Sequence, residues 1–183
     1  TTRPDTIFGV TYIAVSINHE LATQSSKSNK DIHSFISKYK KQKLSEESTA
    51  KIEKDGIFTG KYCLHPITEE KIPIWIADYV LMSYGTGAIM AVPGHDERDY
   101  EFAKKFNLPV VEVVSGGDIE NEAHTDSHEC VMINSSNNSG LDLNGKKVSD
   151  AIESTINWLE ENGKGLKTVQ YKLRDWLFSR QRY

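Results

Sequence analysis

The spacing of apolar and polar residues changes along this chain, and each change predicts a new strand or helix. Residues 7–17, "IFGVTYIAVSI", are rich in β-branched and aromatic side chains, which predicts a largely buried strand. Residues 19–54 are polar and lysine-rich, with a few apolar residues at helical spacing. These apolar residues are Ile32, Phe35, Ile36 and Tyr39. We therefore expect two or three short helices, one of them starting at Ser45, that cover one side of a β core.

The middle of the chain predicts a hairpin followed by a strand, a helix and another strand. Residues 56–67 and 72–82 are two apolar runs separated by the polar "TEEK", and the alternation in the second run is typical of a strand. Residues 85–92, "GTGAIMAV", predict a third strand. Residues 96–106 have the apolar face of a helix, and residues 108–114, "LPVVEVV", predict a strand after it. This β–α–β order predicts a parallel strand pair joined by a crossover helix.

The last third of the chain predicts a loop, a helix and an exit from the domain. Residues 115–140 are mostly a polar loop with a short strand near "CVMI". Residues 146–162 carry apolar residues at helical spacing, which predicts a helix that ends at Gly163. Residues 167–183, "KTVQYKLRDWLFSRQRY", combine basic and aromatic residues and predict a strand and turn. The whole pattern predicts a mixed α/β fold.

The composition narrows the classes of function. The net charge of −4, from 22 Lys and Arg against 26 Asp and Glu, argues against a nucleic-acid coat protein or a membrane-surface binder. It leaves room for a local basic patch. Cys63 and Cys130 are far apart and form no CxxC motif, so neither a cysteine-based metal site nor a secreted disulfide scaffold is expected. No apolar run approaches the roughly 20 residues that cross a bilayer. We expect both ends to be cuts through a longer cytoplasmic protein.

The first candidate site is the polar segment "TTRPDT", residues 1–6. Its threonine hydroxyls both donate and accept hydrogen bonds, which would suit a bound ligand. Arg3, Pro4 and Asp5 would also suit a plain turn, because proline fixes φ and aspartate bonds to nearby backbone groups. The residues alone leave both interpretations open.

The second candidate site is "GHDERD", residues 94–99, which follows the Gly-rich strand. Asp96 is a good helix N-cap, and Asp99 lies three residues later, close to a capping box that also suits the helix dipole. His95 could be a general base, a metal ligand or a surface residue, but no neighbouring His or Cys supports a metal site. No GxSxG elbow supports a nucleophilic serine. A carboxylate at this strand-to-helix junction could instead bind a cation such as an ammonium group.

Three segments in this order resemble the editing domain inserted in the class I leucyl-, isoleucyl- and valyl-tRNA synthetases. They are the threonine-rich residues 1–6, the Gly-rich strand and acidic helix start at 85–100, and the tail at 173–183. "RPDTIFGVTY" and "MAVPGHDERDYEF" resemble the bacterial-type leucyl members, since the isoleucyl and valyl relatives usually have Glu where Asp5 stands. The resemblance implies a β-barrel-like core flanked by helices. It implies an editing domain over 1–170 and a segment over 171–183 that returns to the parent catalytic domain.

The resemblance implies an aminoacyl-tRNA ester hydrolase that corrects mischarged tRNA-Leu. Its substrates would be tRNA-Leu esterified with norvaline, isoleucine or similar amino acids, and leucine would be excluded. Its partners would be the 3′ end of tRNA-Leu and the other domains of the parent synthetase, with no membrane and with a monomeric fragment. Editing would need no metal and no other cofactor, because ATP and Mg²⁺ serve only the parent catalytic domain.

The resemblance also implies roles for individual residues. Asp99 would hold the α-ammonium group of the wrong amino acid, while Thr1 and Thr2 would hydrogen-bond the ester and the terminal ribose. These three form the expected catalytic set. Thr6 would exclude leucine sterically, because a β-branched side chain is stiff. The substrate-binding residues would be Arg3, Asp5, Thr6, Leu81, Tyr84, Met90, Val92, His95, Asp96 and Arg98.

Three alternatives remain open. A non-catalytic module with the same fold could bind an RNA 3′ end, although a decayed binder should have lost part of the threonine and aspartate set. The chain could be the editing domain of an isoleucyl or valyl relative. A metal hydrolase could use His95, Asp96 and Asp99, and chelation would then abolish its activity.

Overall fold

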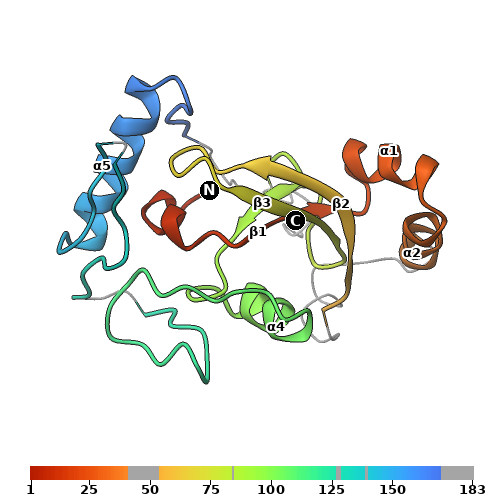
Figure 1. The fold of residues 1–183 in the computed structure, drawn as a ribbon, viewed down its shortest axis with the longest axis horizontal. Helices are drawn as coiled ribbons and strands as arrows, with labels where there is room; N and C mark the ends of the chain where they lie inside the picture. Colours follow the sequence, from red (N-terminus) through yellow and green to blue (C-terminus); the bar gives the residue numbers. More distant parts are fainter. Residues whose placement is uncertain (41–53, 84, 127–128, 139, 170–183) are drawn as a thin grey trace, which may run out of the picture.

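The computed structural model describes residues 1–40, 54–83, 85–126, 129–138 and 140–169. The return segment expected at 171–183 lies outside these ranges. Within them, one mixed β-sheet lies at the centre of the molecule and helices flank it (Figure 1). This arrangement confirms the predicted mixed α/β fold. No helix in the described ranges is long and apolar enough to cross a membrane.

Four strands form the sheet, and their pairing decides which chain segments meet. In sheet order they are β2 (Gly56–Leu64), β3 (Lys71–Ala77), β1 (Tyr12–Ser16) and β4 (Ala88–Ala91). β2 and β3 are antiparallel, as in the predicted hairpin, and β1 runs parallel to β3. β4 is antiparallel to β1, with Tyr12 opposite Ala91. The residues before β1 therefore lie at the same end of the sheet as the residues after β4.

Helix α4 (Glu97–Lys105) covers one face of the sheet. Its Phe102 is fully buried and stacks on Tyr12 of β1 with the ring centroids 5.2 Å apart. The same ring meets Trp75 of β3 edge to face at 5.6 Å. Tyr12 and Trp75 reach the same side because their strands are parallel and side chains alternate along a strand. This aromatic packing fixes α4 relative to β1 and β3.

Helices α1 (Glu20–Ser28) and α2 (Lys30–Lys40) pack on the opposite face, where isoleucines of the sheet meet isoleucines of α2. The His19 ring caps α1 and the Asn29 side chain caps α2, each by accepting a hydrogen bond from an early backbone N–H. Such caps stabilise helix starts because those N–H groups have no partner within the helix. Both helices were predicted, and the one expected at Ser45 lies outside the described residues.

The segment predicted as one strand over residues 7–17 is two elements, so the prediction is wrong at its start. Pro4–Gly9 form a short 3₁₀ helix, η1, and only Tyr12–Ser16 form the strand. The fixed φ of Pro4 suits the first turn of a helix. Thr6 closes that turn, because its Oγ1 donates to the Arg3 carbonyl at 3.0 Å. These local contacts outweigh the β-propensity of the apolar run.

The predicted parallel β–α–β unit over residues 85–114 is also wrong. β4 and α4 form as expected, but residues 108–113 form no strand, and Val114 makes only an isolated antiparallel bridge. The backbone N–H groups of Val113 and Val114 both donate to the His95 ring, so they are not free for a neighbouring strand. The parallel pair in this sheet is β1 with β3.

β3 ends at Ala77, although a strand up to residue 82 was predicted. The chain turns at Asp78, whose carboxylate accepts a hydrogen bond from the Asp55 N–H at 2.9 Å. Burial raises the pKa of this carboxyl group. The turn frees Tyr79 from the strand and directs it toward α4, where it contacts Phe102.

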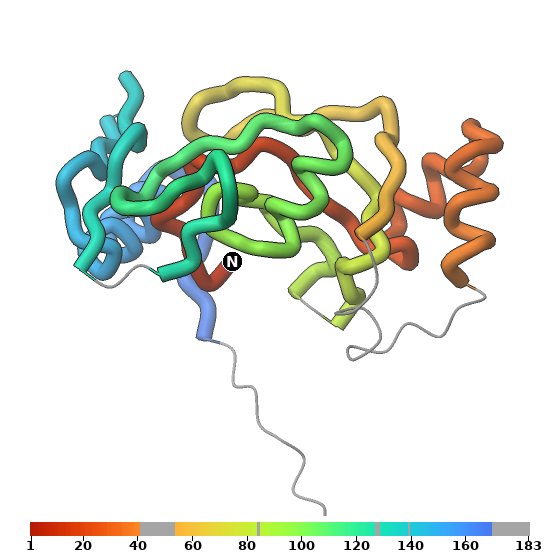
Figure 2. The backbone as a smooth tube through the Cα atoms, turned by 90° about the horizontal axis from the view of Figure 1, so that it is seen from below, coloured from red at the N-terminus to blue at the C-terminus, as the bar shows by residue number. Residues whose placement is uncertain are grey.

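A separate apolar cluster supports the end of the molecule that carries η1. There α5 (Val148–Glu161) packs with η1, and Ile7 is part of the shared core. The predicted helix over 146–162 is confirmed, and the chain passes into a positive φ of 63° at Gly163. Figures 1 and 2 both show α5 and the α1–α2 pair at opposite ends of the sheet.

Candidate functional site

The pairing of β1 with β4 brings the two candidate motifs to one end of the sheet. The backbone N–H of Thr11, just before β1, donates to the Ala91 carbonyl of β4 at 3.2 Å. At the end of η1, a Cβ added to Gly9 would lie only 3.1 Å from Cγ1 of Val92. The glycine therefore lets η1 approach the segment that leaves β4, which a larger residue would push away. The threonine-rich segment and the acidic helix start lie on either side of this contact.

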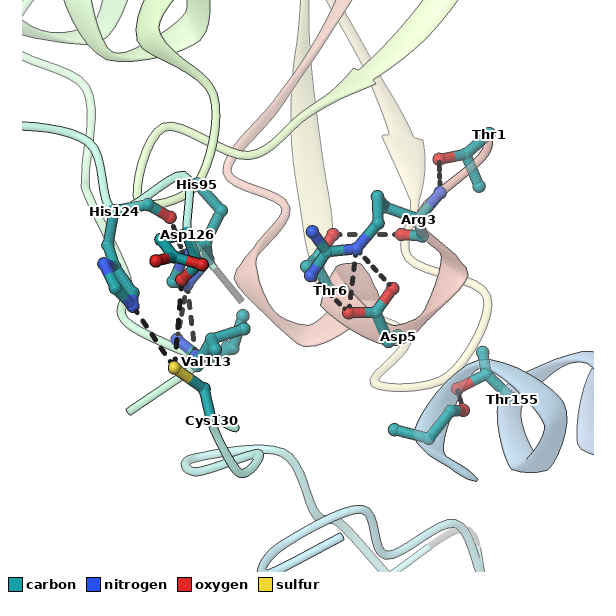
Figure 3. Close-up of polar contacts among 12 residues, drawn as sticks. Thr1, Arg3, Asp5, Thr6, His95, Val113, His124, Asp126, Cys130 and Thr155 are labelled. Carbon is teal, nitrogen blue, oxygen red and sulfur yellow. Dashed lines mark hydrogen bonds and ion pairs between the residues drawn. The ribbon is translucent and has the colours of Figure 1, made fainter. Parts of the chain in front are cut away.

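The threonine-rich segment is organised by one ion pair. Asp5 is fully buried, and the Arg3 guanidinium binds it through Nε and Nη2, with Nη2 2.7 Å from Oδ2 (Figure 3). A buried carboxylate needs such a two-bonded partner, because unpaired charge is costly away from water. Thr1 and Thr2 are exposed beside it, and the Thr1 hydroxyl accepts a hydrogen bond from the Arg3 N–H at 3.1 Å. Thr6 is buried, with its hydroxyl on the Arg3 carbonyl.

Asp96 caps α4 and also orients Arg98. Its Oδ1 accepts hydrogen bonds from the backbone N–H groups of Arg98 at 2.9 Å and Asp99 at 3.2 Å. Its Oδ2 lies 3.0 Å from Nη2 of Arg98. The predicted N-cap is therefore confirmed. Asp99 does not complete a capping box, because its carboxylate points away from the cap into the core.

Asp99 is the buried charge of the second motif. Only 4% of it is exposed, and its two carboxylate oxygens accept from the Tyr79 hydroxyl at 2.8 Å and from the Val92 N–H at 2.9 Å. Burial raises the pKa of Asp99 to about 7, and the neighbouring Asp96 charge adds to this effect. The two hydrogen bonds and Arg98 act in the opposite direction. The site therefore holds a carboxylate whose negative charge a bound cation would stabilise.

Two tyrosines that the sequence did not single out are part of this arrangement. The Tyr12 hydroxyl lies 2.8 Å from that of Tyr79 and 3.3 Å from the Asp99 carbonyl. Burial raises the pKa of both tyrosines, and the Asp99 charge raises it further, so both hydroxyls keep their protons. A tyrosine inside an apolar strand could have given the signal, because its hydroxyl needs a polar partner once the ring is buried.

His95 is held in its neutral form by surrounding backbone groups. Its Nε2 accepts hydrogen bonds from the N–H groups of Val113 at 3.0 Å and Val114 at 3.2 Å, so Nδ1 carries the proton and donates to the His124 carbonyl at 2.9 Å (Figure 3). Burial lowers the pKa of His95, and the charge of Arg3 acts in the same direction. A general base or metal ligand needs a free lone pair, and this one is occupied. The imidazole therefore ties three segments together behind the site.

A second histidine outside both motifs fixes η1. His65, at the end of the β2–β3 hairpin, is buried, and its Nδ1 accepts from the N–H groups of Ile67 and Thr68. Its Nε2 must then carry the proton, and it donates to the Ile7 carbonyl at 2.9 Å. This contact holds the threonine-rich segment against the sheet. No spacing in the sequence pointed to it.

The remaining predicted residues are not all at this end of the sheet. Val92 is buried at the Asp99 contact, and Met90 lies one strand position before Ala91, paired with β1. Leu81 lines a cavity of about 160 Å³ at the opposite end of β1, which neither Thr6 nor Asp99 lines. Tyr84 lies outside the described residues. The structure thus brings the two motifs together and places Leu81 apart from them.

The described residues do not gather the ligands of a metal ion. His124 and Cys130 meet beside His95, with Sγ 3.7 Å from Nε2 of His124. In the part of the chain that the structure describes, no group of three or more His, Cys, Asp or Glu side chains could hold a metal. His95, Asp96 and Asp99 point to different partners, which does not suit the alternative of a metal hydrolase.

Comparison with known proteins assigns this arrangement to a family. A family model described as leucyl-tRNA synthetase, editing domain, matches residues 1–160. The chain belongs to this editing-domain family. The predicted resemblance is therefore confirmed, and its choice of a leucyl rather than an isoleucyl or valyl member is confirmed with it.

Two relatives show the extent of the likeness. The editing domain is 47% identical over its whole length to the leucine–tRNA ligase of Chlorobium limicola, of which it covers 23%. It is also similar to the crystal structure of the LeuRS–tRNA–LeuAMS ternary complex from Agrobacterium radiobacter K84, with a TM-score of 0.66 and 32% identity. That match covers 95% of this chain and 18% of the other. The chain thus spans about a fifth of the length of these relatives.

Proposed function

We propose that this domain hydrolyses the ester bond of mischarged tRNA-Leu, with norvaline, isoleucine and similar amino acids as substrates and with leucine excluded. Membership of the leucyl-tRNA synthetase editing-domain family supports this proposal. The observation that carries it is the buried carboxylate of Asp99, which two hydrogen bonds hold at the same end of the sheet as the threonine-rich segment. The 3′ end of tRNA-Leu and the other domains of the parent synthetase would be its partners.

A second site is needed because one apolar pocket discriminates poorly between amino acids of similar size and shape. Isoleucyl- and valyl-tRNA synthetases illustrate the limit, since one methylene group in such a pocket is worth only about 1–3 kcal/mol. Leucine and isoleucine have the same composition and differ only in branching. When a second, hydrolytic site accepts the wrong amino acids and rejects leucine, the discrimination factors of the synthetic pocket and of the hydrolytic site multiply.

Asp99 would bind the α-ammonium group that every esterified amino acid carries. A carboxylate has about four acceptor positions, and Tyr79 and Val92 use one on each oxygen. Each oxygen therefore keeps an acceptor position that an ammonium group could use. Because the carboxylate is largely removed from water, this ion pair would be stronger than one on the surface. Because all amino acid esters carry this ammonium group, Asp99 would bind all of them, and the selection between amino acids must come from another residue.

Thr6 would supply that selection. Its hydroxyl is fixed by the Arg3 carbonyl at 3.0 Å, so the position of its methyl group is fixed as well. A β-branched side chain held in one rotamer is rigid, so it would clash with the branched γ-carbon of leucine. Substitution of Thr6 by alanine would remove this steric clash and admit leucine.

The hydrolysis itself requires little chemistry from the protein. Water attacks the carbonyl carbon, the carbonyl oxygen gains negative charge, and the bond to the ribose oxygen breaks as that oxygen takes up a proton. Thr1 and Thr2 are exposed beside the Arg3–Asp5 pair, where their hydroxyls could hydrogen-bond the ester and the ribose. Positioning and hydrogen-bond donors near the oxyanion would provide most of the acceleration. We propose that this step uses no cofactor.

The test is a deacylation assay with isoleucyl-tRNA-Leu and leucyl-tRNA-Leu. Asp99→Asn should lose hydrolysis of the isoleucyl ester, since it removes the charge and keeps the shape. Thr6→Ala should gain hydrolysis of the leucyl ester. Thr155→Ala is the matched control for Thr6, because this buried threonine of α5 also donates its hydroxyl to a backbone carbonyl, that of Ala151 at 2.8 Å. Binding of tRNA without turnover by the unsubstituted domain would reject hydrolysis and favour an RNA-end-binding module.

A further inference from the structure

One carboxylate oxygen of Asp99, near the start of α4, accepts a hydrogen bond from a tyrosine that follows β3. Tyr79 follows β3, is 5% exposed, and donates its hydroxyl to Oδ1 of Asp99 at 2.8 Å. We propose that Tyr79 is a positioning residue, which fixes the orientation and the charge of the Asp99 carboxylate through which the site binds the substrate's ammonium group. This inference rests on the function proposed for Asp99.

The Tyr79 hydroxyl has little freedom to leave the carboxylate. Its ring packs against Phe102 with the centroids 5.6 Å apart, and Phe102 in turn stacks on Tyr12. The other carboxylate oxygen is held by the Val92 N–H, which belongs to the segment leaving β4. Two groups from separate parts of the sheet therefore fix both oxygens, and rotation of the carboxylate would break both bonds.

The hydrogen-bond directions follow from the proton on Asp99. When Asp99 is ionised, the single Tyr79 proton goes to it, so Tyr12 must be the donor in the 2.8 Å contact between the tyrosines. When Asp99 is protonated, it donates to Tyr79, Tyr79 donates to Tyr12, and Tyr12 donates to the Asp99 carbonyl at 3.3 Å. The chain of hydroxyls serves both states. A phenylalanine at position 79 would leave the ionised carboxylate without its donor on Oδ1.

The charged and titratable groups around Asp99 come from three directions. Asp96 at the helix cap raises the pKa of Asp99, and Arg98 on α4 lowers it. Tyr12 from β1 and Tyr79 after β3 face it as neutral hydroxyls. β4 has no titratable side chain, and its exit contributes the Val92 N–H. Among the described residues, Tyr79 is thus the side chain whose hydroxyl directly stabilises the ionised form.

Tyr79→Phe tests the proposal by a measurement that does not need turnover. The Asp99 carboxyl signal is assigned in the ¹³C NMR spectrum by its loss in Asp99→Asn, and its midpoint is followed from pH 4 to 9. The midpoint should rise by about one pH unit in Tyr79→Phe, because a hydrogen bond to a charged group is lost. kcat/KM for isoleucyl-tRNA-Leu at pH 7 should fall about tenfold. Tyr100→Phe is the control on the same helix, since its hydroxyl donates to the Glu120 carbonyl at 2.9 Å and not to Asp99.

The outcomes separate this inference from the proposed function. An unchanged midpoint in Tyr79→Phe would overturn the inference, and so would a raised midpoint with unchanged kcat/KM. A raised midpoint in a domain whose unsubstituted form hydrolyses no ester would support the Tyr79–Asp99 contact and reject the proposed function. If Tyr79→Phe does not fold, 3-fluorotyrosine at position 79 provides the same test in the opposite direction. Its more acidic hydroxyl is a stronger donor and should lower the midpoint, and a raised or unchanged midpoint would contradict the inference.

Discussion

The buried carboxylate of Asp99 should make the domain less stable at neutral pH than it would be without that charge. Its pKa rises from an ordinary 3.8 to about 7 in the folded state, mainly because of burial. Between these two values the folded protein holds a proton that the unfolded chain has released. The contribution of Asp99 to the free energy of unfolding must therefore decrease as the pH rises from about 4 to about 7.

The size of this effect follows from the shift. Each pH unit corresponds to about 1.4 kcal/mol, so the upper limit for Asp99 is about 4 kcal/mol above pH 7. Asp99→Asn has the shape of the protonated acid. Its amide oxygen can accept from the Val92 N–H, and its NH₂ group can donate to the Tyr79 hydroxyl. We expect the variant to be more stable than the unsubstituted domain by about 2–4 kcal/mol at pH 8, with the difference shrinking toward pH 4.

Urea unfolding at several pH values from 4 to 8 measures this difference directly. Taking the difference between the two proteins removes the contribution of the titrating groups that do not interact with Asp99. Asp150→Asn is the control, because this exposed carboxylate on α5 lies outside the site. A difference that does not depend on pH, or a variant that is less stable at pH 8, would refute the burial argument for Asp99.

Three further predictions concern His95, the Arg3–Asp5 ion pair and the effect of metal removal. His95→Ala should lower the free energy of unfolding at pH 8 by about 2–3 kcal/mol, because two buried N–H groups lose their acceptor. The contribution of His95 to stability should fall as the pH drops below the ordinary pKa of histidine, since burial lowers the pKa of His95, and the alanine variant should lack this component; the difference between the two proteins in urea titrations reports both effects. Arg3→Leu should lower the free energy of unfolding by about 3 kcal/mol, because it leaves the fully buried Asp5 carboxylate without its partner. Asp5→Asn should cost less, because the Arg3 side chain is one-third exposed and water can solvate its charge. Equal losses in thermal or urea unfolding would contradict this order. Deacylation should be unchanged after chelation and dialysis, and recovery only on metal addition would contradict a metal-free site.

Local features were predictable from the sequence. The helices α2, α4 and α5 follow from apolar residues at helical spacing, and the cap at Asp96 needs only the residues of its own first turn. The antiparallel β2–β3 hairpin likewise joins neighbours in the chain. In each case the residues that stabilise the element lie within a few positions of one another.

Long-range contacts explain the failures. The run at 108–114 has the composition of a strand, but the N–H groups of Val113 and Val114 are taken by His95, which lies far from them in the sequence. The start of the 7–17 run becomes helical through Pro4 and the hydroxyl of Thr6. β-propensity alone could not anticipate either competitor.

The candidate site was predictable as a set of segments and not as a geometry. The motifs at 1–6 and 94–99 were found from their residues, and the β1–β4 pairing brings them to one end of the sheet. The partner of Asp99 was missed, because Tyr79 was assigned to a strand that in fact ends at Ala77. A residue beyond a misplaced strand end cannot be assigned to a site by pattern alone.

The central claim is that this domain hydrolyses wrong esters and spares the right one. The most direct measurement compares kcat/KM of the purified domain for isoleucyl-tRNA-Leu and leucyl-tRNA-Leu, after subtraction of spontaneous hydrolysis, with Asp99→Asn measured alongside. We expect rapid release of isoleucine, background release of leucine, and background release of both by the variant. Equal rates for the two esters, or full activity in Asp99→Asn, would contradict it.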